Sequence, residues 1–330
     1  WRPHGDAYLT TVHMRSLETS TASARDDIAR TLFQVALAIE PAPGGEFLEY
    51  NPLSGFAPDD ETAELRLRYR DHAIYAVGHG TAADWDVEDD AVCRRIRTEA
   101  VPAHVVPAVE TTGLDETSAA GEALALAHLA RIDENPGPVI RSLDAFVDSF
   151  EVWVDRQEER ISEFGSASPV AERIVGRSRT CASRMRESVR LLGADENGTT
   201  RSAFSLGMKA MRLQMRQAYG GLGRPDEPRW RPFQLGFLLT ALTSTADEEH
   251  PDRKVVDLIW FPTGGGKTEA SLGLAAVEIF RRRLKHGAEG GGTAVITRYT
   301  LRLLTAQQFQ RAAALICAME LLRRPGEHQD

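Results

Sequence analysis

The segment from residue 255 to residue 268 constrains the fold of this chain more than any other. An apolar run over 255–260 leads directly into residues 261–268, which read Phe-Pro-Thr-Gly-Gly-Gly-Lys-Thr. Consecutive glycines let backbone N–H groups close around a phosphate, because no side chain stands in the way. The apolar spacing downstream predicts a helix that ends near Gly287, with its positive N-terminal end directed at the same anion. The pattern therefore predicts a buried strand, a phosphate loop and a helix.

Each residue type in this loop has a chemical task. We expect Lys267 to reach the β- and γ-phosphates of ATP and the Thr268 hydroxyl to bind Mg²⁺ through the nucleotide, so these two are the predicted catalytic residues. The general motif has Gly where Phe261 stands, and the alternative is a glycine-rich turn that happens to carry Lys-Thr. The predicted cofactors are ATP and Mg²⁺. The predicted nucleotide-binding residues are Trp230, Gln234, Thr263, Gly264, Gly265, Gly266, Lys267, Thr268 and Glu269.

Two of these residues lie upstream of the loop. The Gln234 amide presents one donor and one acceptor, which match the N6 and N7 edge of adenine, and Trp230 could stack on the base. Pro232 suits the first turn of a helix, so Gln234 could equally be part of an ordinary helix start. The two interpretations are compatible.

A second strand and helix are predicted after a glycine loop at 290–292. Residues 293–297 have strand character, and the segment 298–308 opens a helix. An ordinary amphipathic helix would bury one apolar stripe and leave Arg and Gln outside. The residues that we expect on the buried stripe are Leu303, Leu304, Phe309, Ala313, Ile316 and Met319.

The rest of the chain divides by composition and periodicity. We expect a mixed α/β amino-terminal domain over 1–112, a helical connector over 113–222 and the first part of a RecA-like α/β core over 223–330. Residues 61–70 read as a short charged helix. His79, between two glycines, reads as part of a turn with positive φ, or as a catalytic or metal-binding side chain. One predicted helix of the connector is rich in basic residues, which form a solvated face or a DNA-facing flank: Arg173, Arg177, Arg179, Arg184, Arg186 and Arg190.

Charge is distributed unevenly along the chain. The net charge is −9, yet residues 225–330 hold 14 Lys and Arg against 13 Asp and Glu. The acidity therefore lies in the first 224 residues, and any nucleic-acid path must be a local basic stripe. The three cysteines show no Cys-x-x-Cys spacing, so neither a disulfide framework nor a zinc site is expected. No signal peptide or membrane-spanning run is recognisable, and we expect a cytoplasmic bacterial protein.

Four short stretches carry a resemblance to a known family. They are the phosphate loop, the Arg-Trp-Arg-Pro-Phe-Gln run at 229–234, the segment 298–309 and the Gly-His-Gly segment within 75–85. Together they resemble the DISARM phage-defence helicase family DrmA, of superfamily 2, over roughly residues 70–325. The resemblance implies a zinc-free, ATP-dependent DNA helicase or translocase that acts in antiviral defence with a DrmB-like partner protein.

In that superfamily the segment after the second strand is motif Ia, which grips the backbone of one nucleic-acid strand. Contacts of this kind position a strand without reading its sequence. The resemblance assigns this nucleic-acid-binding role to Arg298, Thr300, Arg302, Thr305 and Gln307.

No acidic pair follows a further strand after the phosphate loop, so the carboxylate that orders Mg²⁺ and water is not found. We therefore expect an amino-terminal fragment of a longer protein, with little ATPase activity by itself. The alternative function is a nucleotide-gated DNA-binding scaffold without productive hydrolysis.

Overall fold

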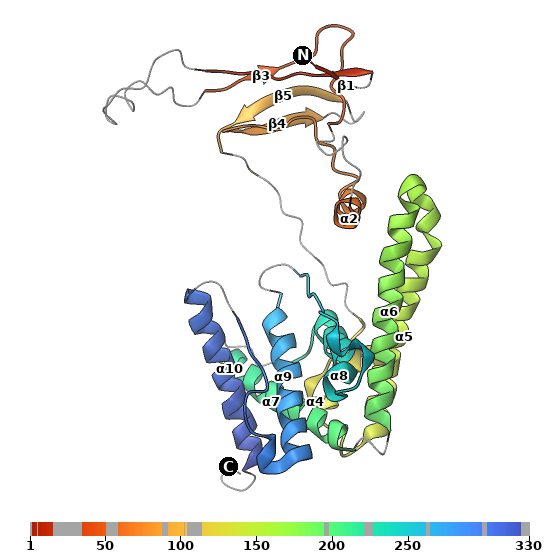
Figure 1. The fold of residues 1–330 in the computed structure, drawn as a ribbon, viewed down its shortest axis with the longest axis vertical. Coiled ribbons are helices and arrows are strands. Elements are labelled where there is room, and N and C mark those ends of the chain that lie inside the picture. The colour runs from red at the N-terminus through yellow and green to blue at the C-terminus, as the bar shows by residue number, and fades with distance from the viewer. Residues whose placement is uncertain are drawn as a thin grey trace, which may run out of the picture. The chain divides into compact units, whose positions relative to one another are not determined.

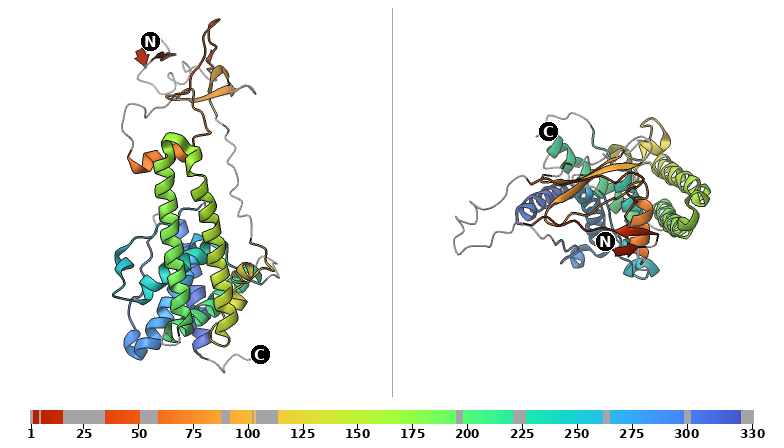
Figure 2. Two further views of the ribbon diagram at one scale, coloured as in Figure 1. Left: turned by 90° about the vertical axis from the view of Figure 1, so that its right-hand side faces the viewer. Right: turned by 90° about the horizontal axis from the view of Figure 1, so that it is seen from above.

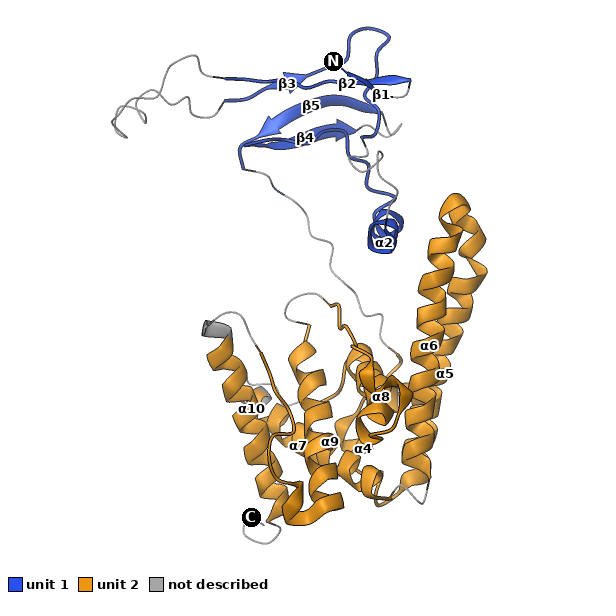
Figure 3. Ribbon diagram, in the orientation of Figure 1, with its two compact units in different colours: residues 1–107 blue, residues 108–330 orange. Residues whose placement is uncertain are grey.

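A computed structural model describes the chain in two compact units, residues 1–107 and 108–330, and each is described here by itself (Figure 3). The description leaves out residues 1, 5, 16–34, 51–58, 88–91, 102, 104–113, 195–197, 221–226, 262–264, 299–301 and 325–330, and the side chains of residues 4, 219 and 302–304. Within the described residues, no helix combines the length and apolar character needed to cross a membrane.

The described residues of the first unit form small antiparallel sheets and the helix α2. Its elements are β1 (Arg2–His4), β2 (Ala7–Leu9), β3 (Ala38–Ile39), α2 (Asp60–Arg68), β4 (Ala82–Val87) and β5 (Cys93–Glu99). β1 pairs with β2, and β5 lies between β3 and β4. Cys93 and Ile96 of β5 are buried. On the same strand, Arg97 forms ion pairs with Asp84 and Asp86 of β4.

Two local predictions in this unit can be compared with the structure. The charged helix is confirmed as α2, whose first turn is capped by the Asp59 carboxylate accepting from the Thr62 N–H at 2.9 Å. In the Gly-His-Gly segment Gly80 has φ +79°, as the turn interpretation requires. Gly78 is needed for a different reason, because a Cβ atom there would lie 2.0 Å from the Thr81 carbonyl oxygen.

The second unit is built mainly of helices (Figure 1). Its α-helices are α3 (Ala119–Glu122), α4 (Leu126–Leu129), α5 (Pro136–Glu159), α6 (Ser168–Gly193), α7 (Gly198–Gly220), α8 (Pro232–Ala246), α9 (Lys267–His286) and α10 (Arg302–Arg323). Short 3-10 turns are η1 (Ile161–Ala167), η3 (Pro251–Lys254) and η4 (Gly287–Gly290). Proline stands in the first turn of α5, α6 and α8, where its missing N–H costs nothing.

α5 and α6 form a long antiparallel hairpin (Figure 2). Arg186 of α6 contacts three carboxylates of α5, those of Asp144, Asp148 and Glu151, at 2.5 to 2.9 Å. Arg179 likewise pairs with Asp155 and Glu158. Two arginines of the predicted basic face, Arg179 and Arg186, therefore form ion pairs between the two helices of the hairpin.

One hydrophobic core joins most helices of the second unit. α7 lies at its centre, with Phe204, Met208 and Met211 completely buried, so these methionines fill the core. α4, α8, α9 and α10 also contribute buried residues to this cluster. The predicted boundary at residues 222–223 lies outside the described residues, and helices on both sides of it share the core.

Two glycines permit the close packing of α9. A Cβ atom at Gly207 of α7 would lie 2.7 Å from Val277 Cγ2 and 3.2 Å from the Val277 nitrogen. A Cβ atom at Gly273 of α9 would lie 3.0 Å from Trp230 Cη2. Side chains at these positions would therefore push α9 away from α7 and from Trp230.

The two strands expected in the RecA-like core are not assigned as strands. Segments 255–260 and 293–298 are irregular, and among the described residues neither joins a sheet. Val256, Leu258 and Ile296 are 87 to 90% exposed. The mixed α/β character of the chain is confirmed, whereas the RecA-like sheet stays a prediction. A strand is stabilised by neighbouring strands, and the described residues supply none here.

The buried face of α10 was predicted wrongly at two positions. Phe309 is 73% exposed and Ile316 is 51% exposed, whereas Leu315, Ala318 and Met319 are buried. α10 packs on α7 and α9 through the latter set, so the contact stripe is rotated by about one residue from the predicted one.

The glycine contact between α7 and α9 can be tested with a matched pair of variants. Gly207→Ala should lower the free energy of unfolding by about 1–3 kcal/mol because the methyl group overpacks the crossing. Gly176 is exposed on α6, and no atoms lie near a Cβ added there. Gly176→Ala should therefore raise the free energy of unfolding by up to about 1 kcal/mol, because alanine favours the helix over glycine. Denaturant unfolding measures both values. Equal effects of the two substitutions would contradict the close approach.

A partly buried histidine, His128, predicts a loss of stability in acid. His128 of α4 makes a 2.9 Å hydrogen bond from Nε2 to Ser142 Oγ, and burial lowers the pKa of His128 below its ordinary value. Because the folded state favours neutral imidazole, stability is complete above the unfolded pKa of about 6.5 and falls as the pH drops below it. Unfolding free energies at pH 7.5 and 5.5 should differ less in His128→Gln than in the native chain. An unchanged difference would show that other groups cause the loss.

Candidate nucleotide-binding site

The end of the predicted phosphate loop forms the start of α9. Gly266 has φ +89° and occupies the N-cap position, and Lys267 and Thr268 are the first two helical residues. Lys267 Nζ donates a hydrogen bond to the Phe261 carbonyl oxygen, so the lysine side chain folds back across its own loop. Residues 262–264 lie outside the described part, including the predicted site residues Thr263 and Gly264.

Two side chains at the start of α8 hold the loop glycines. Arg231 Nη1 donates to the Gly265 carbonyl oxygen at 3.0 Å. Gln234 Nε2 donates to the Gly266 carbonyl oxygen at 2.7 Å, while Gln234 Oε1 accepts from the Arg231 backbone N–H at 2.7 Å. Gln234 is 4% exposed, and its bond to the Gly266 carbonyl, together with that of Arg231 to Gly265, holds the end of the loop against α8.

The hydrogen bonds to the Gly265 and Gly266 carbonyls also orient the backbone amide groups that follow them. In a trans peptide the C=O bond and the following N–H bond point in opposite directions. The N–H groups of Gly266 and Lys267 therefore point away from the side chains of Arg231 and Gln234. Together with the N-terminal end of the α9 dipole, they offer positive potential to an anion. The required residue at position 266 is glycine, because φ is positive and a Cβ atom would lie 2.5 Å from Gln234 Nε2.

Phe261, the residue that departs from the general motif, has a structural role. Its ring stacks on Phe233 of α8, with centroids 4.1 Å apart and an interplanar angle of 15°. The stacked pair attaches the beginning of the loop to α8, as Arg231 and Gln234 attach its end. Sequence reasoning missed both Arg231 and Phe233, although each belongs to the Arg-Trp-Arg-Pro-Phe-Gln run that it singled out.

The two predicted adenine contacts have other partners in the structure. Trp230 is 3% exposed, lies against Gly273 and places its indole Nε1 3.4 Å from Met208 Sδ. This is a core position. The Gln234 amide donates to the Gly266 carbonyl of the loop and accepts from the Arg231 N–H at the start of α8, and an amide has further hydrogen-bonding capacity. Adenine recognition by either residue stays a prediction.

Glu269 is the last residue of the predicted nucleotide-binding set. It lies beside the loop and forms an ion pair with a residue of α10. It occupies the first turn of α9, where a carboxylate complements the helix dipole. Arg311 Nη1 of α10 donates to Glu269 Oε1 at 2.9 Å. The side chain of Glu269 is 18% exposed and that of Arg311 is 36% exposed. The contact connects the phosphate-loop helix to the helix of the predicted nucleic-acid segment.

The predicted nucleic-acid residues are only partly described. Arg298 is exposed in the segment before α10, and Thr305 and Gln307 are exposed near the start of that helix. Thr300 and the side chain of Arg302 lie outside the described residues. The structure thus places three of the five on exposed positions near one end of α10.

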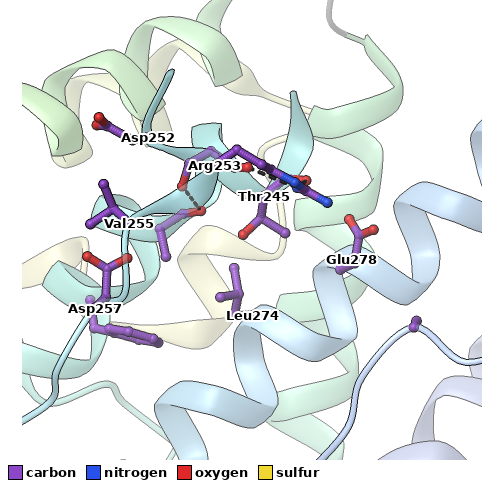
Figure 4. Close-up of a pocket in the computed structure, with 11 residues that line it drawn as sticks. Thr245, Asp252, Arg253, Val255, Asp257, Leu274 and Glu278 are labelled. Carbon is purple, nitrogen blue, oxygen red and sulfur yellow. Dashed lines mark hydrogen bonds between the residues drawn. The ribbon is translucent and has the colours of Figure 1, made fainter. Parts of the chain in front are cut away.

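A separate pocket of about 410 Å³ lies between α8, η3 and α9 (Figure 4). Asp252, Asp257 and Glu278 contribute carboxylates to its lining. Asp252 and Asp257 pair with Arg184 of α6, which is buried, and Glu278 pairs with Arg281. A wall with these carboxylates suits a polyanionic nucleotide poorly, so the phosphate loop is the better candidate for nucleotide binding.

The hydrogen bonds of Gln234 predict a local effect on the loop. Gln234→Ala leaves the Gly266 carbonyl and the Arg231 N–H without their buried partner, which costs about 1–3 kcal/mol. Hydrogen exchange in a peptide covering residues 261–270 should accelerate. Gln310→Ala, at an exposed position of α10, serves as the control and should leave exchange there unchanged. Native-like exchange in Gln234→Ala would mean that the amide does not hold the loop.

Comparison with known proteins gives one informative relative. No protein-family model matches the chain. Over 314 residues the chain is 30% identical to the DISARM protein DrmA of Bacillus paralicheniformis. The match covers 89% of this chain and 27% of that protein, so the chain spans little more than a quarter of its relative's length. The resemblance carried by the four short stretches is thereby confirmed: the chain is a DrmA-like relative.

Proposed function

We propose that this chain is the nucleotide-binding part of an ATP-dependent superfamily 2 DNA helicase or translocase that acts in bacterial phage defence of the DISARM type. One observation carries the proposal. Lys267 begins a helix directly after glycines whose carbonyls are held by Arg231 and Gln234, which leaves the adjacent amide groups directed away from α8. This is the arrangement that binds the phosphates of a nucleoside triphosphate.

The residues fit Mg²⁺-ATP by their chemistry. Lys267 would exchange its bond with the Phe261 carbonyl for the β- and γ-phosphates, and the amide groups of Gly266 and Lys267 would contact the same oxygens. The Thr268 hydroxyl would bind Mg²⁺, which neutralises phosphate charge when bound. Thr263 and Gly264 complete the proposed loop, and Gln234 would add an adenine contact.

The proposed DNA contacts lie along the segment that leads into α10. Arg298, Thr300, Arg302, Thr305 and Gln307 would hold phosphates of one strand. Their exposed positions, where described, support this role. The DISARM relationship supports a role in phage restriction in the bacterial cytoplasm, with a DrmB-like partner.

The second candidate is a nucleotide-gated DNA-binding scaffold without productive hydrolysis. The observation in its favour is that protein side chains already occupy three carbonyls of this region: Lys267 bonds to Phe261, Arg231 to Gly265 and Gln234 to Gly266. A loop ordered in this way can bind nucleotide without completing a hydrolytic site.

The two candidates predict different behaviour of the full-length protein. DNA should stimulate ATP hydrolysis, added salt should reduce that stimulation, and Lys267→Ala should lower the stimulated rate by at least about 100-fold because the lysine stabilises charge in the transition state. The measurement is the ATPase rate with and without DNA across a salt series.

Lys285→Ala is the matched control, because Lys285 lies at the exposed C-terminal end of the same helix. It should hydrolyse ATP like the native protein. If the native protein binds nucleotide but hydrolyses it no faster than Lys267→Ala, the scaffold function is supported and the helicase or translocase function is rejected.

A further inference from the structure

The ion pair between Glu269 and Arg311 gives the proposed nucleotide site a feature that the phosphate loop alone does not have. The two residues are 42 positions apart in the sequence, and their side chains meet at 2.9 Å. Glu269 is only two residues beyond Lys267. A Cβ atom at Gly266 would lie 3.3 Å from Glu269 Oε2, which shows how close the carboxylate is to the loop.

A carboxylate at this position has opposite effects on the two states of the loop. Without nucleotide it complements the positive end of α9. With nucleotide it lies near a triphosphate of the same sign, and the repulsion is considerable in a partly buried site. Arg311 compensates the Glu269 charge and so reduces this repulsion. The nucleotide affinity then depends on whether Arg311 stays in place.

Arg311 belongs to a rigid element that reaches the proposed DNA contacts. It lies four residues after Gln307 on α10, so the two side chains project from the same face one turn apart. α10 also holds Thr305, a further proposed DNA contact. A shift of α10 caused by a bound strand would therefore move the Arg311 guanidinium relative to Glu269.

We propose that the Arg311–Glu269 ion pair couples DNA binding to nucleotide binding, with Arg311 as a positioning residue that sets the charge beside the phosphate loop. The inference rests on the proposed function, because it requires that the loop binds a nucleoside triphosphate. By linkage the coupling is reciprocal: DNA changes nucleotide affinity by the same factor as nucleotide changes DNA affinity.

The test measures both affinities in the full-length protein. Binding of a non-hydrolysable ATP analogue with Mg²⁺ is titrated with and without a single-stranded oligonucleotide, for the native protein, Arg311→Gln, Glu269→Gln and the double variant. Arg323→Gln is the control, because Arg323 pairs with Glu320 at the far end of the same helix.

In the native protein DNA should change analogue affinity by about 5-fold or more. Without DNA, Arg311→Gln should weaken analogue binding by about 5- to 10-fold, since Glu269 then faces the phosphates uncompensated. Adding Glu269→Gln should restore the affinity, because the uncompensated charge is removed. Each single variant should lose the DNA effect, and Arg311→Lys should recover part of it. Arg323→Gln should behave like the native protein.

Three results would overturn the proposal in distinguishable ways. If the native protein binds analogue and DNA without mutual influence, the coupling is absent while the proposed nucleotide site stands. If the coupling exists and Arg311→Gln retains it, another element transmits it. If the native protein binds no analogue, the proposed function fails and the coupling fails with it. A circular dichroism melt of each variant separates loss of folding from loss of binding.

Discussion

The contact between α7 and α9 is the constraint on which the candidate site depends. α7 supplies the buried centre of the second unit, and Gly207 lets α9 approach it so closely that one methyl group would collide with Val277. Because α9 is fixed in this way, its first residues and the adjoining Gly265 and Gly266 have a defined place beside α8. The candidate nucleotide site is therefore a product of helix packing as well as of its own sequence.

The loop itself is held by side chains that come from outside the recognised motif. Arg231 and Gln234 bind its glycine carbonyls, and Phe233 stacks on Phe261. A chain of glycines has high conformational entropy when unfolded, and such contacts offset the cost of ordering it. The same contacts explain why a phenylalanine can replace the first glycine of the motif: its ring anchors the loop to α8 instead of leaving it free.

Local chemistry alone indicates the candidate nucleotide site. The glycines, the lysine and the following helix with its cap at Gly287 could be read from order and spacing alone, and Gly266 and Gly287 do have positive φ. The features that local sequence did not determine depend on partners distant in the chain. Segments 255–260 and 293–298 have strand composition but no strand beside them in the described residues, and the stripe that α10 buries is chosen by the surfaces of α7 and α9. Arg311 could not have been assigned, because nothing near it in the sequence indicates a contact with Glu269.

The exposed segments near the site have a practical consequence for work with this stretch of chain. Val256 and Leu258 in one segment and Ile296 in the other present apolar side chains on backbone that the described residues leave outside any sheet. Exposed apolar segments whose backbone is not paired in a sheet can pair with strands of a neighbouring chain. Made by itself at high concentration, this polypeptide is expected to self-associate through these segments, and its solubility should improve when polar residues replace those three side chains.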